Sequence, residues 1–496
     1  MTTRLLRAFG ISYLPNRLHP NLAFARVSVL GHVDEETIGT GSHTENSIGL
    51  INKSTICSGL RRNLIDGPAT SDRSEMNKVP PQPAIARLPF SSGFAPALAC
   101  QETLHFLTPL TWHVGILLMD RDTELALLDR IQAHRKAGRG TDTASSAWQQ
   151  HVSAYISPDR LNAERKLLTY VPTVVGLSGL LPDAGTYATT MLGDAPIVLT
   201  RNQDGKFAAM LNVCRHRGAE VATGCGSAAL LSCPYHGWTY RLDGSLAARR
   251  RPEHFGELEE NGLVQLPALE QDGLLWVSGT PDTEIPAQPL QGAQADLAGF
   301  DLGGHRLFTS TTFTRPINWK LVIDTFLEVY HVPVLHEQTL GGLIYGDYSL
   351  FDGYNEHGRM IVTRTSIGDL DDQARDDWQF LQHSTIVWAL QPSTILIYQQ
   401  DHAQLYQARP GAHAGESIIT VSIYVPQETT IDDSHWQKNF DLLVQVTDTE
   451  DFVTCAGIQR GFASGAQDVV TFGANEPLLA HYERNLNRLV ENASER

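Results

Sequence analysis

The sequence predicts an α+β protein in which a small antiparallel β domain is followed by a larger domain of helices and strands. Residues 165–280 consist of short stretches of alternating hydrophobicity, separated by turn dipeptides such as Asp-Gly. Residues 281–298 are rich in Pro, Gln and Ala and are typical of a linker. Residues 299–496 combine strand patterns with long helical patterns, and their mixed alternation favours a curved antiparallel sheet.

The individual elements follow from the same two periodicities. In the first domain, residues 187–200 alternate around Gly193-Asp194 and predict a hairpin, while residues 207–213 predict a strand. In the second domain we expect strands at 306–313, 386–390, 395–398, 405–408 and 418–424, and helices at 318–330, 434–462 and 478–490.

The first 118 residues differ in character from the rest of the chain. Residues 1–118 show no sustained periodicity, whereas Met119 begins a helical pattern with Asp122 or Thr123 as the N-cap. This change favours Met119 as the true initiator, with a poorly ordered extension or a targeting peptide as the alternatives. Residues 119–164 are then an N-terminal helical segment.

The composition excludes several classes of protein. A net charge of −17 over 496 residues argues against a nucleic-acid partner, because nothing supplies a basic face. We expect no membrane helix, since the chain contains no apolar run of about 18 residues or more. The 6 cysteines do not form a disulfide framework, which favours a reducing compartment and therefore the cytoplasm.

Two short loops each offer a cysteine and a histidine. Cys214 and His216 lie in Cys-Arg-His-Arg-Gly, and Cys233 and His236 lie in Cys-Pro-Tyr-His-Gly-Trp. Two thiolates that hold one iron and two imidazoles that hold its partner are the ligand set of a Rieske [2Fe–2S] cluster. A zinc site would more often pair like ligands, and a c-type haem needs C-x-x-C-H, which is absent from the sequence.

A second group of metal-ligating residues lies in the larger domain. The predicted helix 318–330 carries Glu328, and His331 lies three residues later on the same helical face. Pro333 ends this helix and lets the chain turn, so that His336 can approach the same ion as His331. Two histidines and one carboxylate that leave positions open for O₂ form the non-haem Fe(II) triad.

Residues 155–496 resemble the catalytic α subunit of Rieske-type non-haem iron oxygenases, the ring-hydroxylating oxygenase family. Two signatures carry this resemblance. One is the pair of Cys-His loops within residues 214–238, and the other is Asn-Trp-Lys…Glu-x-x-His-x₄-His at residues 318–336. It implies a Rieske β domain followed by a helix-grip (START-like) catalytic domain, with a [2Fe–2S] cluster and a mononuclear Fe(II) as cofactors. It also implies a homotrimer with head-to-tail electron transfer.

The resemblance assigns roles to further residues. Glu328 would connect His236 of one subunit with His331 of its neighbour, and a Glu at this position is closer to the subgroup that oxidises quaternary ammonium compounds. The third iron ligand in the family precedes a Gln on a late helix. By its offset from Gln459, Asp451 is that ligand rather than Glu450 or Asp448.

The expected activity is that of an oxygenase component. O₂ would be activated at the mononuclear iron to hydroxylate an aromatic ring, by one or two oxygens as in aromatic hydrocarbon catabolism, or to demethylate a small organic substrate. A separate NAD(P)H-dependent reductase or ferredoxin would deliver electrons, because the chain has no Rossmann Gly-rich fingerprint. The alternative is a non-catalytic Rieske electron carrier fused to a ligand-binding helix-grip domain. Four aromatic residues could line the pocket or belong to the core: Tyr345, Phe351, Trp388 and Tyr398.

Overall fold

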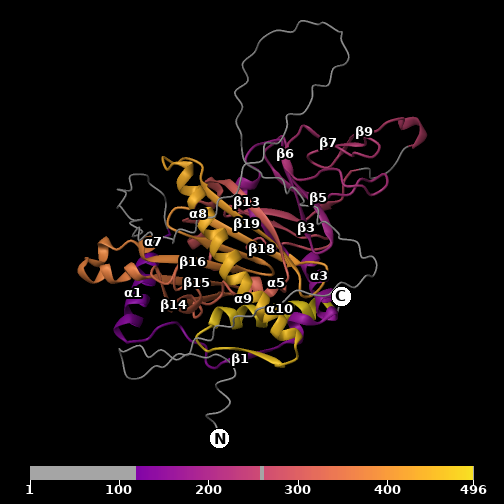
Figure 1. Cartoon of the computed structure of the whole chain (residues 1–496). Helices are drawn as coiled ribbons and strands as arrows, with labels where there is room; N and C mark the ends of the chain where they lie inside the picture. Colours follow the sequence, from indigo (N-terminus) through magenta and orange to yellow (C-terminus); the bar gives the residue numbers. More distant parts are fainter. Residues whose placement is uncertain (1–118, 257–261, 495–496) are drawn as a thin grey trace, which may run out of the picture. The chain divides into compact units, whose positions relative to one another are not determined.

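The computed structural model describes residues 119–256 and 262–494 (Figure 1). The hypothesis about residues 1–118 lies outside this part of the chain. Within it, five antiparallel sheets and the helices that cover them confirm the predicted α+β class. No helix among these residues has the length and apolar character needed to cross a membrane.

Helix α1 (Arg121–Lys136) begins one turn earlier than the sequence pattern indicated. The carboxylate of Asp120 accepts a hydrogen bond from the Thr123 backbone N–H at 3.2 Å, so Asp120 is the N-cap and the expected cap at Asp122 or Thr123 is wrong. The predicted inner face of the helix is buried: Leu125, Leu128 and Ile131.

The segment between α1 and the first β domain is only partly helical. Strand β1 (Trp148–His151) pairs antiparallel with β20 (Val469–Phe472), which ties this segment to the C-terminal part of the chain. The short α2 (Ser153–Ile156) and the longer α3 (Pro158–Tyr170) follow. The boundary expected after residue 164 therefore falls inside α3.

The first β domain contains the predicted hairpins. Strands β3 (Thr186–Leu192) and β4 (Ala195–Arg201) join at Gly193, whose φ of +55° suits a tight hairpin turn. These strands belong to a five-stranded sheet with the order β10-β5-β4-β3-β6. The other strands of this domain are β2 (Thr173–Leu177), β5 (Phe207–Leu211), β6 (Cys225–Ser227), β7 (Leu230–Ser232), β8 (Thr239–Arg241), β9 (Leu246–Ala248), β10 (Gln265–Leu266), β11 (Ala268–Gln271) and β12 (Leu274–Val277).

The second domain is built on a seven-stranded antiparallel sheet with the order β13-β19-β18-β17-β16-β15-β14. The five strands expected from the sequence are present, and β14 and β15 extend the sheet beyond them. Their bounds are β13 (His305–Arg315), β14 (Ile344–Tyr354), β15 (His357–Arg364), β16 (Ser384–Leu390), β17 (Thr394–Tyr398), β18 (Ala403–Pro410) and β19 (Ser417–Pro426).

Both faces of the central strands are buried, which explains their nearly continuous apolar sequence. Val387 and Ala389 of β16 pack into the core that the C-terminal helices cover. Trp388, between them, points to the opposite face together with Tyr398 and packs against β12 of the first domain. Trp388 and Tyr398 are therefore core residues and do not line a substrate pocket.

The long helix expected at 434–462 is present and has a π-helical turn at its centre. It consists of α8 (Asp433–Val446), the π turn η6 (Thr447–Asp451) and α9 (Phe452–Ala463), and it packs on one face of the large sheet (Figure 1). Helix α10 (Pro477–Ser494) covers the same core. The short helices elsewhere are α4 (Gln294–Ala298), α7 (Phe380–His383), η1 (Ser178–Leu180), η2 (Pro252–His254), η3 (Leu302–Gly304), η4 (Thr365–Asp372) and η5 (Arg375–Asp377).

The helix expected at 318–330 is wrong beyond its second turn. Helix α5 (Trp319–Asp324) ends early, and a separate short helix, α6 (Val332–Leu335), carries Pro333 in its first turn. Pro333 thus begins a helix rather than ending one, because a proline has no N–H to lose at that position. Between the helices, the Glu328 carboxylate accepts the backbone N–H groups of Tyr330 and His331, which favours a turn over continued helix.

Candidate metal centres

The two Cys-His loops have the same backbone geometry. Gly218 and Gly237 adopt φ values of +78° and +71°, which explains why glycine follows each Cys-His pair. In each loop one N–H closes the turn onto the cysteine carbonyl, and the cysteine N–H bonds across the loop. These hydrogen bonds are Gly218 to Cys214 at 2.9 Å, Cys214 to Ala219 at 2.8 Å, Gly237 to Cys233 at 3.0 Å and Cys233 to Trp238 at 2.8 Å.

The four donor side chains are divided between the interior and the surface. Cys214 and Cys233 are each 3% exposed, whereas His216 and His236 are partly exposed. The Nδ1 atoms of the two histidines lie 3.1 Å apart, so that both can face one metal ion. Buried sulfurs and outward imidazoles suit a two-iron cluster whose histidine-bound iron lies nearer the surface.

Two aromatic side chains hold these loops from below. Trp238 is 2% exposed, and its indole stacks on the His216 ring with centroids 5.1 Å apart, as expected for a dry shell around the donors. The Tyr240 hydroxyl lies 3.3 Å from the Cys214 sulfur and accepts the Arg215 backbone N–H at 3.0 Å. Sequence reasoning missed Tyr240, and its place two residues after Trp238 on β8 is the only signal for it.

The second group brings His331, His336 and Asp451 together. One potential ligand atom from each residue lies within 4.8 Å of the others. The Asp451 Oδ1 atom is 3.1 Å from His336 Nε2 and 3.7 Å from His331 Nε2. His336 and Asp451 are buried and His331 is half-buried, so the site is accessible from one side. This donor set fits a mononuclear Fe(II).

Each histidine of this group is oriented by a carboxylate at its other ring nitrogen. His331 Nδ1 is hydrogen-bonded to Glu328, and His336 Nδ1 lies 2.6 Å from Glu450 Oε2. Both Nε2 atoms are thereby directed at Asp451. A carboxylate behind a ligating imidazole fixes its tautomer and raises its basicity, which is the usual support of a metal-bound histidine.

The π turn η6 separates the three candidate acids of the late helix. Asp451 faces the two histidines, and Glu450 supports His336 and accepts the Thr339 hydroxyl at 3.0 Å. Asp448 instead pairs with Arg315 at 2.6 Å. A π turn is common at functional sites. Here it points two successive acids at one centre. Sequence reasoning missed the supporting role of Glu450.

The electrostatics of this group favour a bound cation. Burial lowers the pKa of His336, but hydrogen bonds to Asp451 and Glu450 outweigh this effect, so the pKa lies above its ordinary value. On the side of His331, burial and the negative charge of Glu328 raise the pKa of Glu476, an acid just before α10. Several carboxylates thus surround two imidazoles, and a divalent cation would balance them.

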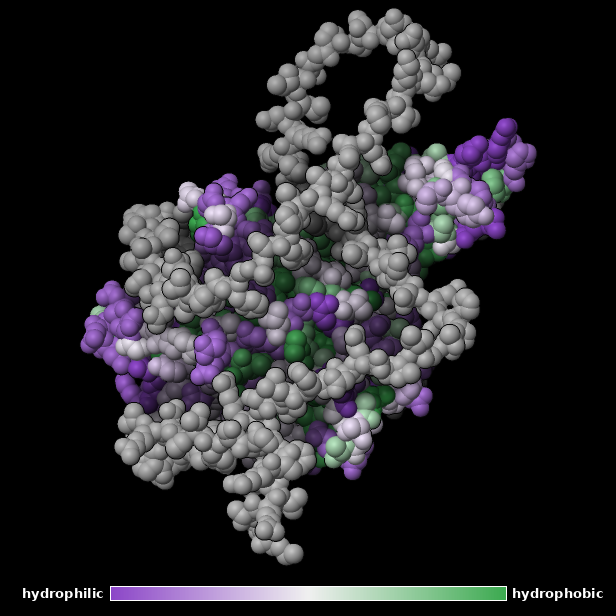
Figure 2. Space-filling view, viewed as in Figure 1, coloured by the Kyte–Doolittle hydropathy of each residue, from purple (hydrophilic) through white to green (hydrophobic). Residues whose placement is uncertain are grey.

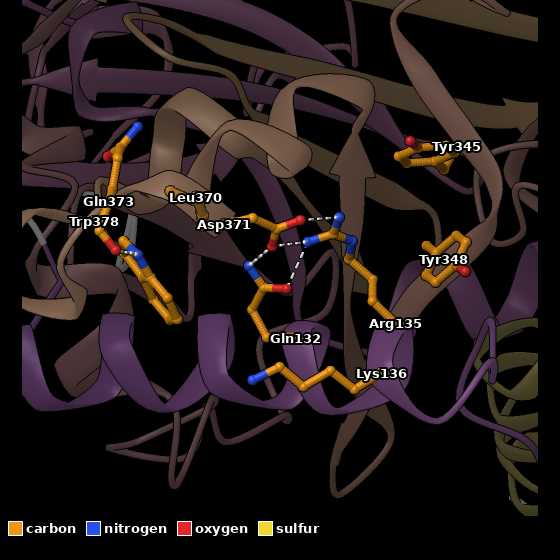
Figure 3. A pocket seen from close by; sticks show the side chains of 9 residues that line it. All are labelled: Gln132, Arg135, Lys136, Tyr345, Tyr348, Leu370, Asp371, Gln373 and Trp378. Atoms are coloured by element: carbon orange, nitrogen blue, oxygen red, sulfur yellow. Dashed lines mark hydrogen bonds and ion pairs between the residues drawn. The ribbon is translucent and has the colours of Figure 1, made fainter.

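Two cavities among the described residues lie away from these donors. One of about 660 Å³ lies between α1 and β14 (Figure 3), where Arg135 pairs with Asp371 at 2.9 Å and Tyr345 and Tyr348 form part of the wall. Another of about 380 Å³ includes Phe351. Tyr345 and Phe351 therefore line other cavities, and neither cavity includes a residue of the iron triad.

The fold and the two donor sets define a two-domain protein with one site for an iron–sulfur cluster and one for a single iron. Residues 172–266 match the Rieske [2Fe–2S] domain, and residues 304–492 match the ring hydroxylating alpha subunit (catalytic domain). The chain therefore contains a Rieske domain followed by a domain of the ring hydroxylating alpha subunit type. The two domains imply a Rieske cluster and a mononuclear iron as cofactors.

The curated relatives are oxygenase subunits. The chain is 34% identical to the glycine betaine monooxygenase oxygenase subunit of Chromohalobacter salexigens over 183 residues, which is 36% of this chain and 41% of that protein. It is 33% identical to the carnitine monooxygenase oxygenase subunit of Escherichia coli K12, over 33% of this chain and 45% of that protein. The chain thus spans less than half the length of these relatives.

Solved structures share the fold. A quaternary ammonium Rieske monooxygenase with bound L-carnitine superimposes with a TM-score of 0.59 and 20% identity, over 70% of this chain and 96% of that one. Naphthalene 1,2-dioxygenase from Rhodococcus sp. gives a TM-score of 0.56 and 16% identity, over 75% of this chain and 98% of that one. These similarities confirm the predicted order of a Rieske domain and a catalytic domain.

We expect Asp451→Ala to remove the mononuclear iron and to leave the cluster in place. The change deletes one of three donors and the negative charge that faces both histidines. Iron analysis of the purified protein should fall from about three to about two Fe per chain. Asp448→Asn is the control, because Asp448 pairs with Arg315 and should leave the iron count unchanged. Iron loss in the control and not in Asp451→Ala would reverse the assignment.

Glu450→Gln tests the support of His336. We expect the affinity for the mononuclear iron to fall about 10- to 100-fold, because the amide orients the ring but no longer raises its basicity. Competition with an iron chelator measures this affinity. Glu428→Gln, an exposed position in the loop after β19, should have no effect. Equal affinities of Glu450→Gln and wild type would contradict the proposed support.

Proposed function

We propose that the chain is the oxygenase component of a Rieske monooxygenase that oxidises a methyl group of a small quaternary ammonium compound. The observation that carries this proposal is the convergence of His331, His336 and Asp451, with both histidines held by carboxylates, in a chain that also offers the Rieske donors. The intact triad favours an enzyme over the alternative of an electron carrier with a ligand-binding domain.

In this proposal, His331, His336 and Asp451 hold the mononuclear iron, which when bound supplies the chemistry of reductive O₂ activation. The Rieske cluster is held by Cys214, His216, Cys233 and His236. Glu450 keeps the His336 ring in place from behind. The Thr325 hydroxyl donates to Asp451 Oδ1 at 3.3 Å, and this is the carboxylate oxygen that lies opposite the two histidine Nε2 atoms.

Electrons reach the triad from a neighbouring subunit. Glu328 contacts His331 Nδ1 and lies at the surface end of the site, beside Tyr330 and Val334, which are 68% and 83% exposed. Exposed apolar side chains around a functional acid are typical of an interaction surface. We infer that the His236 loop of another copy docks here and that Glu328 connects the two histidines in a head-to-tail homotrimer.

The tip of the Rieske domain has the complementary character. Tyr235, next to His236, is 57% exposed, and Arg217 donates to its hydroxyl at 3.3 Å. Arg250 and Arg251 are exposed nearby in sequence, and Figure 2 shows the end of the domain with β7 and β9 as hydrophilic. A basic tip suits both the Glu328 carboxylate and an acidic ferredoxin or NAD(P)H-dependent reductase that supplies the electrons.

The relatives support the substrate class. Glycine betaine and carnitine, named for the sequence relatives, are quaternary ammonium compounds, and so is choline, named for a spinach relative that is 33% identical over 175 residues. Aromatic hydrocarbon catabolism, one outcome expected from the sequence, has no support among them. Near the triad, the rings of Phe326 and Tyr406 lie 4.3 Å apart, and aromatic faces attract an ammonium group.

Oxygen uptake tests the proposal directly. With a generic ferredoxin reductase and NADH, we expect substrate-dependent O₂ consumption with betaines, choline or carnitine, and one formaldehyde or one hydroxylated product per O₂. Aromatic acids and naphthalene should give no product. Product from the aromatic compounds and none from the ammonium compounds would replace this substrate class by the other.

Glu328→Gln tests the electron path. We expect both metals to stay bound and steady-state turnover to fall about 10- to 100-fold, because the amide cannot accept from two histidines as a carboxylate does. Iron analysis and the visible spectrum of the cluster check the metals, and stopped-flow reoxidation of the cluster checks the electron transfer. The exposed Glu428→Gln is the control. Full turnover in Glu328→Gln would refute the connecting role.

A further inference from the structure

A cluster of buried charges lies between α3, α5 and α10, outside the set of residues that hold the metals. Glu164, Lys320 and Glu483 are at most 1% exposed, and Asp324 is 8% exposed. Arg160 completes the cluster through a 2.8 Å contact between its Nε and Glu164. These are not ordinary surface acids, because charged side chains are almost never this buried without a partner.

Both cations of the cluster are bound to the same acid. The Glu164 carboxylate accepts hydrogen bonds from Lys320 Nζ at 2.7 Å and from Trp319 Nε1 at 2.8 Å, in addition to Arg160. Lys320 also contacts Asn318. Glu164 thus accepts three hydrogen bonds, while Arg160 Nη2 has no partner among the described residues. Burial raises the pKa of Glu483 and outweighs the charges of Lys320 and Arg160, which lower it.

The other two acids lack donors. Asp324 Oδ2 accepts the Tyr155 hydroxyl at 2.8 Å, but Asp324 Oδ1 and both carboxylate oxygens of Glu483 have no hydrogen-bond partner among the described residues. With three acids and two bases, the fully ionised cluster would carry a net negative charge in a buried place. Such a charge is costly, and a buried group avoids the cost by binding a proton.

Asp324 and Glu483 are neighbours. One proton shared between them removes the net negative charge and gives the unpartnered carboxylate oxygens a hydrogen bond. Burial holds the pKa of Asp324 well above its ordinary value, and the negative charge of Glu483 adds to this. Burial also raises the pKa of Glu483. A protonated carboxyl is a donor to its partner, so the unpartnered oxygens become a hydrogen-bonded pair and the cluster becomes neutral.

This acid pair lies next to the proposed iron site. Asp324 ends α5, and the following residue, Thr325, donates to Asp451. Burial raises the pKa of the Cys455 thiol to about 12, and the negative charges of Asp451 and Asp324 both add to this, so Cys455 of α9 lies near both acids. The charged and titratable groups that face the pair are Tyr155, Arg160, Glu164, Lys320, Cys455 and Tyr482.

We propose that Asp324 and Glu483 share one proton and serve as a proton reserve for the neighbouring oxygen-activating site. The functional part of this inference rests on the proposed function. Hydroxylation of a C–H bond by one O₂ consumes two electrons and two protons and yields the alcohol and one water. The reductase supplies the electrons, the pair releases one proton and becomes two carboxylates, and solvent supplies the second proton and later restores the first. Asp324 and Glu483 are a proton reserve in this scheme and are not ligands of the iron.

Infrared spectroscopy tests the shared proton without any turnover. In D₂O near neutral pH, the wild-type protein should show the carbonyl band of a buried protonated carboxylic acid. Asp324→Asn and Glu483→Gln should each abolish it, because one acid fewer leaves the cluster neutral without a proton and the amide replaces the O–H donor. Glu491→Gln, an exposed acid on α10, should keep the band. A wild-type spectrum without this band, or a band that survives in both variants, would overturn the shared proton.

The pH dependence of stability gives a second measurement. An acid whose pKa is raised by folding stabilises the protein at low pH, and this contribution is lost as the pH rises through the pKa of the folded state. The melting temperature of the wild type should therefore fall more steeply, as the pH rises above the ordinary carboxyl range of about 4, than that of Asp324→Asn or Glu483→Gln. Parallel curves would contradict the shared proton.

Steady-state kinetics distinguish a proton reserve from a purely structural role of Asp324 and Glu483. Asp324→Asn and Glu483→Gln should keep both metals and KM but lower kcat, most at high pH, with an increased solvent deuterium isotope effect. An unchanged kcat and an unchanged isotope effect would refute the proton reserve. The infrared band would still show whether the two acids share a proton. A wild type that binds both metals and oxidises no tested compound would instead contradict the proposed function, and the infrared result would be independent of it.

Discussion

The mononuclear site depends on one constraint: two imidazoles must point the same ring nitrogen at one carboxylate. A free histidine rotates and exchanges its tautomers, so each ring needs a second contact. Glu328 supplies it for His331 and Glu450 for His336, and these two acids come from segments more than a hundred residues apart. The break between α5 and α6 and the π turn η6 both serve this constraint, since a regular helix at either place would misdirect an acid.

The large sheet accommodates these two irregular segments, because its two faces pack on different parts of the chain. One face packs on α5, α9 and α10 and carries the triad, and the other packs on the Rieske domain and α1. The Tyr424 hydroxyl accepts the Leu177 N–H at 3.4 Å, and Thr394 donates to the Val174 carbonyl at 3.0 Å across the second face. Interdomain packing is thus separated from the reactive face by the sheet itself.

Regular periodicity made most of the fold predictable, and local competition explains the failures. The apolar runs at 386–390 and 395–398 and the helical repeat at 434–462 matched the structure, because burial of both strand faces and of one helix face imposes those patterns. The helix expected at 318–330 failed because the Glu328 side chain takes the backbone N–H groups that would continue it. The donors were predictable by motif, whereas the supporting roles of Glu450 and Tyr240 depend on contacts across the fold that spacing does not encode.

An oxygenase site must receive electrons and protons, and the segment from Asn318 to His336 separates the residues proposed for each. Its exposed end carries Glu328 and His331, where electrons can arrive from a docked neighbour, and its buried end carries Lys320 and Asp324 among acids of α3 and α10. Electrons cross a protein interface without atoms moving far, whereas protons need titratable groups that keep a proton at working pH. The interruption between α5 and α6 therefore lets one segment carry both Glu328, the proposed electron inlet, and Asp324, the acid proposed to share a proton.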